Sequence, residues 1–206
     1  MKELRFTLRH SEAARAPANA SARKRPRSLS TGDEVESART VSVRLVEFID
    51  EIQEAEDDVD KHFGLFVWPC ALVLAHYLAS QYSQLVSNCT VLELGCGIAL
   101  PGILCAMGGE AKRVILSDRA DSDTIKRNVE ANIHLNGVAH IASYKPLNWG
   151  SLDLVDHVER LSTVDIILAA DCFYKSEDFE KVLVTVALVF RLNPRALFLA
   201  TYQLRR

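Results

Sequence analysis

The sequence predicts an α/β fold in which a parallel sheet is covered by helices on both faces. Short apolar runs alternate along the chain with segments whose apolar residues recur at helical spacing. The apolar runs are continuous and do not alternate with polar residues, which is typical of strands that are buried on both sides. A glycine pair, Gly95 and Gly97, directly follows the first of these runs and precedes a helical segment.

The first elements of this domain are a helix, a strand and a second helix. A helix is expected from Pro69, because proline suits the first helical position and apolar residues follow at helical spacing as far as Ala79. Residues 90–94 form a short apolar run and are expected to be the first strand of the sheet. Residues 101–107 are expected to form a helix, which two glycines at 108–109 bring to an end.

A second strand is expected at residues 113–116, which are mostly apolar and are followed by Ser117-Asp118. Residues 121–135 have helical spacing, and the pair Asn136-Gly137 is a good helix C-terminus. Residues 138–144 are expected to form the third strand.

The last segment repeats the alternation twice. A helix is expected at residues 152–161 and a nearly all-apolar strand at 164–169. Ser176 could cap a further helix over residues 177–192, which ends at Asn193-Pro194. Residues 196–201 are expected to form the fifth strand, so the sequence predicts a doubly wound parallel sheet.

Residues 1–40 differ from the rest of the chain in composition. They contain nine Lys/Arg and five Asp/Glu, a net charge of +4, whereas the whole chain has −3. They are rich in Arg, Ala and Ser, so we expect a disordered basic tail over 1–40 and one domain over 41–206, which begins with a strand or short helix at 41–52. The cluster Arg23–Arg27 resembles a nuclear localisation patch, although a solvated tail would have the same composition. We therefore expect the protein in nucleus and cytoplasm.

Several classes of function are not expected. No apolar run reaches the roughly 18 residues that a membrane span needs, so we expect a soluble protein without a membrane partner. The histidines and cysteines have no spacing typical of metal ligands, and no metal is expected. The part of the chain after residue 40 has a net charge of −7, and direct nucleic-acid binding is not expected.

The strongest motif is the glycine turn with its two acidic neighbours. Glu93 lies two residues before Gly95, and Asp118 follows the second predicted strand. Glycines let the backbone approach a ligand, and an acid at the end of the second strand can accept both hydroxyls of a ribose. A dinucleotide site would more usually show a third glycine and no acid at position 93. A tight turn without a ligand, with Asp118 as a helix cap, is the alternative.

The order of these motifs resembles the methyltransferase-like 21/23 branch of the seven-strand S-adenosylmethionine (SAM) dependent methyltransferases. The resemblance covers about residues 63–204 and rests on the glycine motif and five further motifs: residues 66–71, 100–104, 147–150, 170–174 and 201–203. It implies a Rossmann-like doubly wound SAM-methyltransferase sheet, with SAM as the cofactor.

The resemblance also implies roles for individual residues. Glu93, Gly95 and Gly97 would line the methionine part of SAM, and Asp118 would hold the ribose. The remaining contacts would come from Trp149 with Asn148 at the adenine, Trp68 over the cofactor, and Asp171 at the methionine end beside the transferred methyl. Core packing is the alternative for each tryptophan.

For the acceptor side, the resemblance implies that Asp171 and Tyr174 are catalytic. It implies methylation of a protein arginine, with a histone as substrate and chaperone or chromatin complexes as partners. Tyr174 keeps a signature of lysine methyltransferases, so protein lysine methylation stays open, as does a catalytically silent module that binds SAM or a partner. The acids Glu177, Asp178 and Glu180 could supply a second carboxylate for a guanidinium, or could be first-turn helix acids.

The sequence ends at Arg206, directly after the fifth predicted strand. The seven-strand family continues beyond this point, so we expect a sheet truncated after the fifth strand, with its C-terminal strands missing and residues 196–201 as an open edge.

Overall fold

The computed structural model of the chain describes residues 1–10, 37–47, 63–151, 153–159, 161 and 163–204. Five parallel strands form its main sheet in the order β5-β4-β3-β6-β7. Their bounds are β3 Thr90–Leu94, β4 Arg113–Ser117, β5 Ala142–Tyr144, β6 Ile166–Ala170 and β7 Leu197–Thr201. The predicted α/β fold with a doubly wound parallel sheet is thus confirmed.

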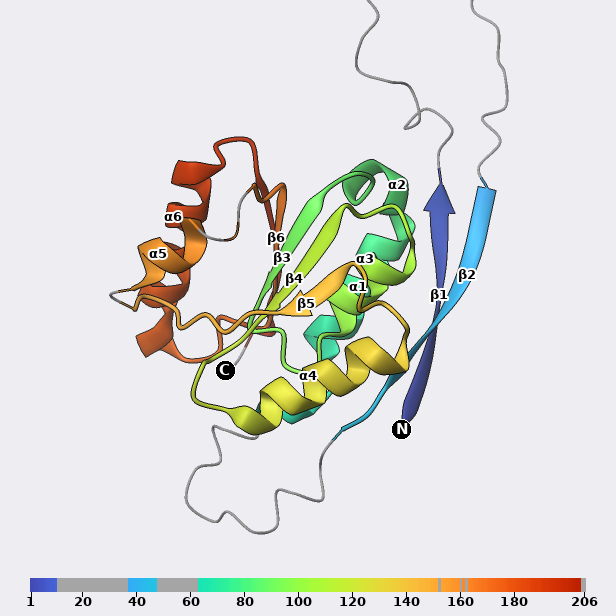
Figure 1. Cartoon of the computed structure of the whole chain (residues 1–206), viewed down its shortest axis with the longest axis horizontal. Coiled ribbons are helices and arrows are strands. Elements are labelled where there is room, and N and C mark those ends of the chain that lie inside the picture. The colour runs from blue at the N-terminus through green and yellow to red at the C-terminus, as the bar shows by residue number, and fades with distance from the viewer. Residues whose placement is uncertain (11–36, 48–62, 152, 160, 162, 205–206) are drawn as a thin grey trace, which may run out of the picture.

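Helices cover both faces of the sheet, as Figure 1 shows. One face carries α1 (Pro69–Ser80), α3 (Leu100–Met107) and α4 (Asp123–Leu135), with the short α2 (Tyr82–Leu85) beside them. The other face carries α5 (Leu154–Glu159) and α6 (Phe179–Leu192). Two apolar cores result, one on each side of the strands. None of the helices among the described residues is long and apolar enough to cross a membrane.

The observed bounds differ from the predicted ones mainly at the third strand and the last helix. β5 is only three residues long, because residues 138–141 form a hydrogen-bonded turn after α4. A 3₁₀ turn, η4 (Ser176–Asp178), precedes α6, so Ser176 does not cap that helix. Neither is Asp118 the cap of α4: Ser122 is, and its hydroxyl accepts the Ile125 N–H.

The expectation of a disordered tail is wrong at both of its ends. β1 (Lys2–His10) and β2 (Ser37–Leu45) pair antiparallel, with Phe6 opposite Val41. This ribbon packs on α1, α2, α3 and α4 at the outside of the molecule (Figure 1). Its inward residues alternate with polar ones and are buried: Phe6, Leu8, Val41, Val43 and Leu45. The cluster Arg23–Arg27 and residues 48–62 lie outside the described residues.

The strand order places a topological switch at the centre of the sheet. β3 is hydrogen-bonded to β4 on one side and to β6 on the other. The connections that leave β3 and β6 therefore diverge to opposite faces and open a crevice beyond the carboxyl ends of these strands, where open α/β sheets bind ligands. The glycine turn follows β3, Asp118 follows β4 and Asp171 follows β6, so all three lie at this crevice.

Candidate cofactor and acceptor site

The glycine turn between β3 and α3 needs its glycines for both conformation and space. Gly95 and Gly97 have φ angles of 57° and 52°, in the left-handed region that disfavours a side chain. A Cβ atom at Gly95 would lie 2.8 Å from Trp149 Cζ2 and 3.0 Å from Cys172 Sγ. At Gly97 it would lie 3.0 Å from the carbonyl oxygen of Gly64. The turn is thus closed in by its neighbours, and its backbone can face a ligand.

Asp118 ties the end of β4 to this turn. Its Oδ2 accepts the Gly97 N–H at 2.8 Å, and its Oδ1 accepts the Arg119 N–H at 2.8 Å. Burial raises the pKa of Asp118 above its ordinary value, and the two N–H donors oppose that shift. A carboxylate in this place has lone pairs left for the hydroxyls of a ligand, which fits the predicted ribose role.

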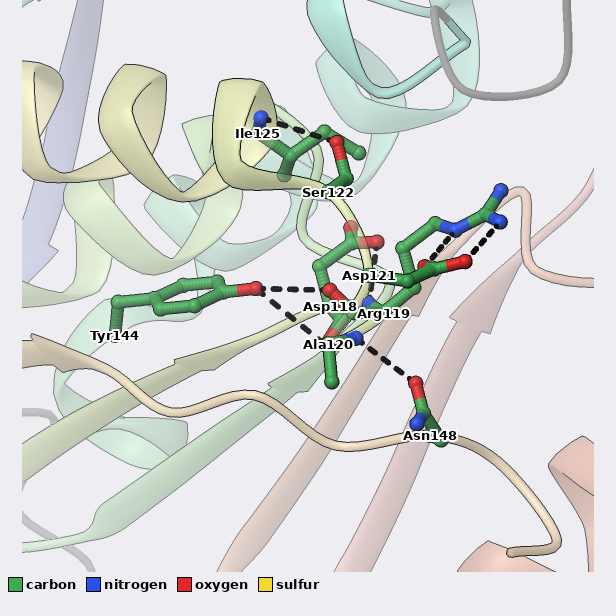
Figure 2. A network of polar contacts seen from close by, with 8 residues as sticks. All are labelled: Asp118, Arg119, Ala120, Asp121, Ser122, Ile125, Tyr144 and Asn148. Atoms are coloured by element: carbon green, nitrogen blue, oxygen red, sulfur yellow. Dashed lines mark hydrogen bonds and ion pairs between the residues drawn. The ribbon is translucent and has the colours of Figure 1, made fainter. Parts of the chain in front are cut away.

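The loop after Asp118 is held by a polar network, shown in Figure 2. Arg119 pairs with Asp121 through two bonds of 2.6 and 2.7 Å, and the Tyr144 hydroxyl donates to the Arg119 carbonyl at 3.2 Å. Asn148 Oδ1 accepts the Ala120 N–H at 2.8 Å. This bond orients Asn148 to the loop, and Asn148 does not line the cavity described below. Asn148 thus holds the loop through Oδ1, and its predicted contact with the adenine stays a prediction.

Glu93 lies beneath the turn, with its side chain directed at the start of α3. Only 1% of the residue is exposed, and its Oε2 accepts the Gly102 N–H at 2.9 Å. A Cβ atom at Gly102 would lie 2.5 Å from that oxygen, so glycine is needed there too. Burial raises the pKa of Glu93 to about 8, against the effect of the Gly102 N–H and with a further contribution from the charge of Asp118.

One cavity of about 470 Å³ joins these groups to the end of β6. This volume is within the range usual for small-molecule sites. All predicted site residues except Asn148 line it: Trp68, Glu93, Gly95, Gly97, Asp118, Trp149, Asp171 and Tyr174. Among the described residues, no group of three or more His, Cys, Asp or Glu side chains could hold a metal ion.

Asp171 lines the same cavity as Asp118. It directly follows β6, is 7% exposed, and has a φ of 61°, a left-handed conformation that is uncommon for a residue with a side chain. The Asp171 N–H donates to the Thr201 carbonyl of β7 at 2.7 Å, which fixes this backbone. The alternative acids Glu177, Asp178 and Glu180 do not line the cavity, and Asp178 pairs with Lys181 at 2.7 Å.

Four aromatic residues form a rim that borders the cavity near the start of α1: Phe63, Phe66, Trp68 and Tyr174. Phe63 and Phe66 are not among the predicted site residues. The Phe63 ring meets Trp68 edge-on at 5.9 Å between centroids and Tyr174 at 6.1 Å. Trp68 Nε1 donates to the Phe63 carbonyl at 2.7 Å. Phe66 also lines the cavity and is 36% exposed. The close spacing of three aromatic residues just before a helix is the sequence signal for this rim.

Replacing Glu93 with glutamine is expected to flatten the pH dependence of stability. The folded chain keeps a proton on Glu93 up to a pKa of about 8, whereas the unfolded chain releases it near the ordinary value of 4.5. The folded state thus binds more protons between these values, and the contribution of Glu93 to stability falls as pH rises through this window. Glutamine keeps an acceptor for the Gly102 N–H without this titration.

Urea unfolding of both chains at several pH values between about 5 and 9 measures this effect. The parent chain should lose stability relative to Glu93→Gln as pH rises, by at most ~1.4 kcal/mol for each unit of pKa shift. A stability difference that stays constant over this range would contradict the assignment of a buried, neutral Glu93.

Known proteins match most of this chain in sequence. The sequence profile of the "Lysine methyltransferase" family matches residues 49–206. Histone-arginine methyltransferase METTL23 of Xenopus laevis is 41% identical over 145 residues, covering 69% of this chain and 58% of the relative. The human protein of that name is 38% identical over 143 residues, covering 68% of this chain and 71% of the relative. This chain therefore spans little more than half the length of some relatives.

A lysine-specific relative matches as well. The protein N-lysine methyltransferase METTL21A of Xenopus tropicalis is 39% identical over 120 residues, covering 58% of this chain and 52% of the relative. Relatives named for arginine methylation and a relative named for lysine methylation therefore both align with more than half of this chain.

Proposed function

The chain belongs to the lysine methyltransferase family, and we propose that its site transfers a methyl group from SAM to a side-chain nitrogen of a protein, with a histone arginine as the leading acceptor. The observation that carries this proposal is the continuity of the cavity. Asp118 and the glycine turn line it together with Asp171 and Tyr174. Cofactor and acceptor would therefore meet within one enclosed space.

The residues at the turn fit the cofactor. Backbone with left-handed glycines faces the cavity, Asp118 offers acceptors for a ribose, and the Trp149 ring lies against Gly95. When bound, SAM would supply a methyl group on a positively charged sulfur: the acceptor nitrogen would bond to the methyl carbon in line as the C–S bond breaks, S-adenosylhomocysteine would leave, and the nitrogen would release one proton. Because this displacement depends on alignment, the chain's contribution is mainly to orient the two reactants and exclude water.

The acceptor end suits a cationic side chain. Phe63, Trp68 and Tyr174 form an aromatic rim, and aromatic faces attract cations of the lysine and arginine type. Asp171 adds a carboxylate to the lining of the cavity, where it can orient an ammonium or guanidinium group. A guanidinium that passes the rim would then present one nitrogen to the methyl group.

Lysine is the second candidate acceptor. Asp171 is followed after two residues by Tyr174, and Glu177, Asp178 and Glu180 do not bring a second carboxylate to the cavity. A single carboxylate with a tyrosine suits an ammonium at least as well as the planar fork of a guanidinium, which prefers two acceptors.

Two measurements test this function in sequence. Calorimetry on the purified chain should detect SAM binding, and Gly95→Arg should abolish it, because that side chain would collide with Trp149 and Cys172. Incubation with SAM and histones, followed by mass spectrometry of the peptides, then identifies the modified residue. Methyl-arginine supports the leading reading and methyl-lysine the second. Binding without any transfer would leave a SAM-binding module.

Location and partners belong to the same proposal. We propose that the protein works in nucleus and cytoplasm, with chromatin or chaperone complexes as partners, on the basis of the cluster Arg23–Arg27 and the names of the histone-modifying relatives. Deletion of residues 21–28 should shift a fluorescent fusion towards the cytoplasm. An unchanged distribution would remove the support for a localisation signal.

A further inference from the structure

The end of strand β2 is connected by hydrogen bonds to two segments that line the candidate site. Val46 and Glu47 follow β2 directly, and they precede residue 49, where the match to the family begins. Their contacts lead to two separate segments, the glycine turn after β3 and the aromatic rim before α1. The ribbon is thus connected to the site by residues that the family match does not include.

The first connection runs through Asn132 of α4. This side chain is fully buried, and its Oδ1 accepts the Val46 N–H at 2.7 Å. Its Nδ2 donates to the Val46 carbonyl at 3.3 Å and to the Ile98 carbonyl at 3.2 Å. Ile98 directly follows Gly97, so one amide joins α4, the end of β2 and the glycine turn.

The second connection runs through Glu47, whose side chain is 8% exposed. Its Oε1 accepts the Val67 N–H at 3.1 Å and pairs with Lys2 Nζ of β1 at 2.7 Å. Val67 lies between the rim residues Phe66 and Trp68. Glu47 therefore attaches the rim to both strands of the ribbon.

The two connected segments also touch each other. A Cβ atom at Gly97 would lie 3.0 Å from the Gly64 carbonyl oxygen and 3.4 Å from Gly64 Cα. The rim segment thus rests on the glycine turn at the position where both face the cavity. A small displacement of either one would change the shape of the space between them.

We propose that Asn132 and Glu47 are positioning residues which, through the end of β2, hold the glycine turn and the aromatic rim in register for SAM. The ribbon is then a structural part of the cofactor site. Holding the turn in its bound conformation before the ligand arrives reduces the ordering cost of binding. The inference rests on the proposed function in one respect, that SAM is the ligand.

Asn136 provides a matched control on the same helix. Its Oδ1 accepts the Arg44 N–H at 2.8 Å, and its Nδ2 donates to the Arg44 carbonyl at 2.6 Å. Asn136 therefore bonds to both the N–H and the carbonyl of Arg44, as Asn132 does to those of Val46. Arg44 lies two residues before Val46 in the chain. Neither of these bonds reaches the glycine turn or the rim.

The test compares four variants of the full chain: Asn132→Ala, Asn136→Ala, Glu47→Ala and Glu47→Gln. Glutamine keeps an acceptor for the Val67 N–H, so it should rescue the loss caused by alanine. We expect the SAM dissociation constant to rise about tenfold, equivalent to ~1.4 kcal/mol, in Asn132→Ala and Glu47→Ala. It should stay within about twofold of the parent value in Asn136→Ala and Glu47→Gln, at temperatures where each variant is folded by circular dichroism.

Hydrogen exchange without SAM separates this inference from the proposed function. In Asn132→Ala the amides of residues 95–99 should lose protection, and in Glu47→Ala those of residues 63–68, whereas Asn136→Ala should leave both segments as in the parent. A parent chain that fails to bind SAM would refute the proposed function, while exchange would still test the connections. Equal weakening of SAM binding by Asn132→Ala and Asn136→Ala, or unchanged exchange in both segments, would overturn the inference.

Discussion

Replacing Asp118 with alanine is expected to abolish SAM binding at concentrations that saturate the parent chain. The substitution removes the acceptor that fixes the Gly97 N–H at 2.8 Å and the carboxylate proposed to hold the ribose. Hydrogen bonds to a charged group are worth roughly 1.5–3 kcal/mol each, so losing two or more should raise the dissociation constant at least about 100-fold. Calorimetric titration with SAM measures this change.

Asp121 is the matched control for this experiment. It lies on the same loop and pairs with the Arg119 side chain, but it does not line the cavity. Asp121→Ala should change SAM affinity by less than about threefold, because an exposed ion pair contributes little. Asp118→Asn should fall between the two, since an amide oxygen can still accept the Gly97 N–H. If Asp118→Ala bound SAM as the parent does, the proposed ribose site would be wrong.

Replacing Asp171 with asparagine is expected to lower the rate of methyl transfer about 100-fold or more, with a much smaller effect on SAM affinity. The shape of the side chain is kept, but the negative charge that would orient a cationic acceptor is lost. Removing one preorganised electrostatic contact typically costs ~3–4 kcal/mol of transition-state stabilisation. Transfer rates on a histone substrate, with SAM affinity measured in parallel, give the two quantities.

Asp178 serves as the control for Asp171. It is an acid seven residues later, it pairs with Lys181, and it does not line the cavity. Asp178→Asn should leave the transfer rate within about twofold of the parent, because an exposed ion pair contributes little. A fall in SAM affinity as large as the fall in rate would assign Asp171 to the cofactor alone. An unchanged rate would exclude it from catalysis.

Sequence periodicity was sufficient for the sheet, since most of its strands are largely apolar runs between turn residues. Bounds were less well predicted where tertiary contacts decide them. The predicted strand starts at Val138, but β5 begins only at Ala142. The backbone between them forms hydrogen bonds within the turn that follows α4. Asp118 could equally have been a helix cap from its sequence position, and its bonds to Gly97 and Arg119 decided otherwise.

The N-terminal ribbon shows the limit of reading composition. Residues 2–10 alternate apolar and polar side chains, but their strand partner lies some thirty residues later, beyond an Arg- and Ser-rich stretch. The alternation of Leu4, Phe6 and Leu8 is a local strand signal, but the composition of the whole stretch favoured a tail, and only the tertiary structure identifies the strand with which it pairs. The same is true of Phe63, whose contact with Tyr174 joins residues from opposite ends of the domain.

The sequence by itself determined the α/β class, the strand order along the chain, the glycine turn and the acids at the strand ends. These follow from local periodicity and from the rule that parallel strands bring their carboxyl ends to one edge. Only the tertiary structure decided which of those residues face the cavity, that Asn148 Oδ1 accepts the Ala120 N–H, and that Glu93 directs its carboxylate at Gly102. Side-chain direction and burial depend on contacts between distant segments, which local sequence does not specify.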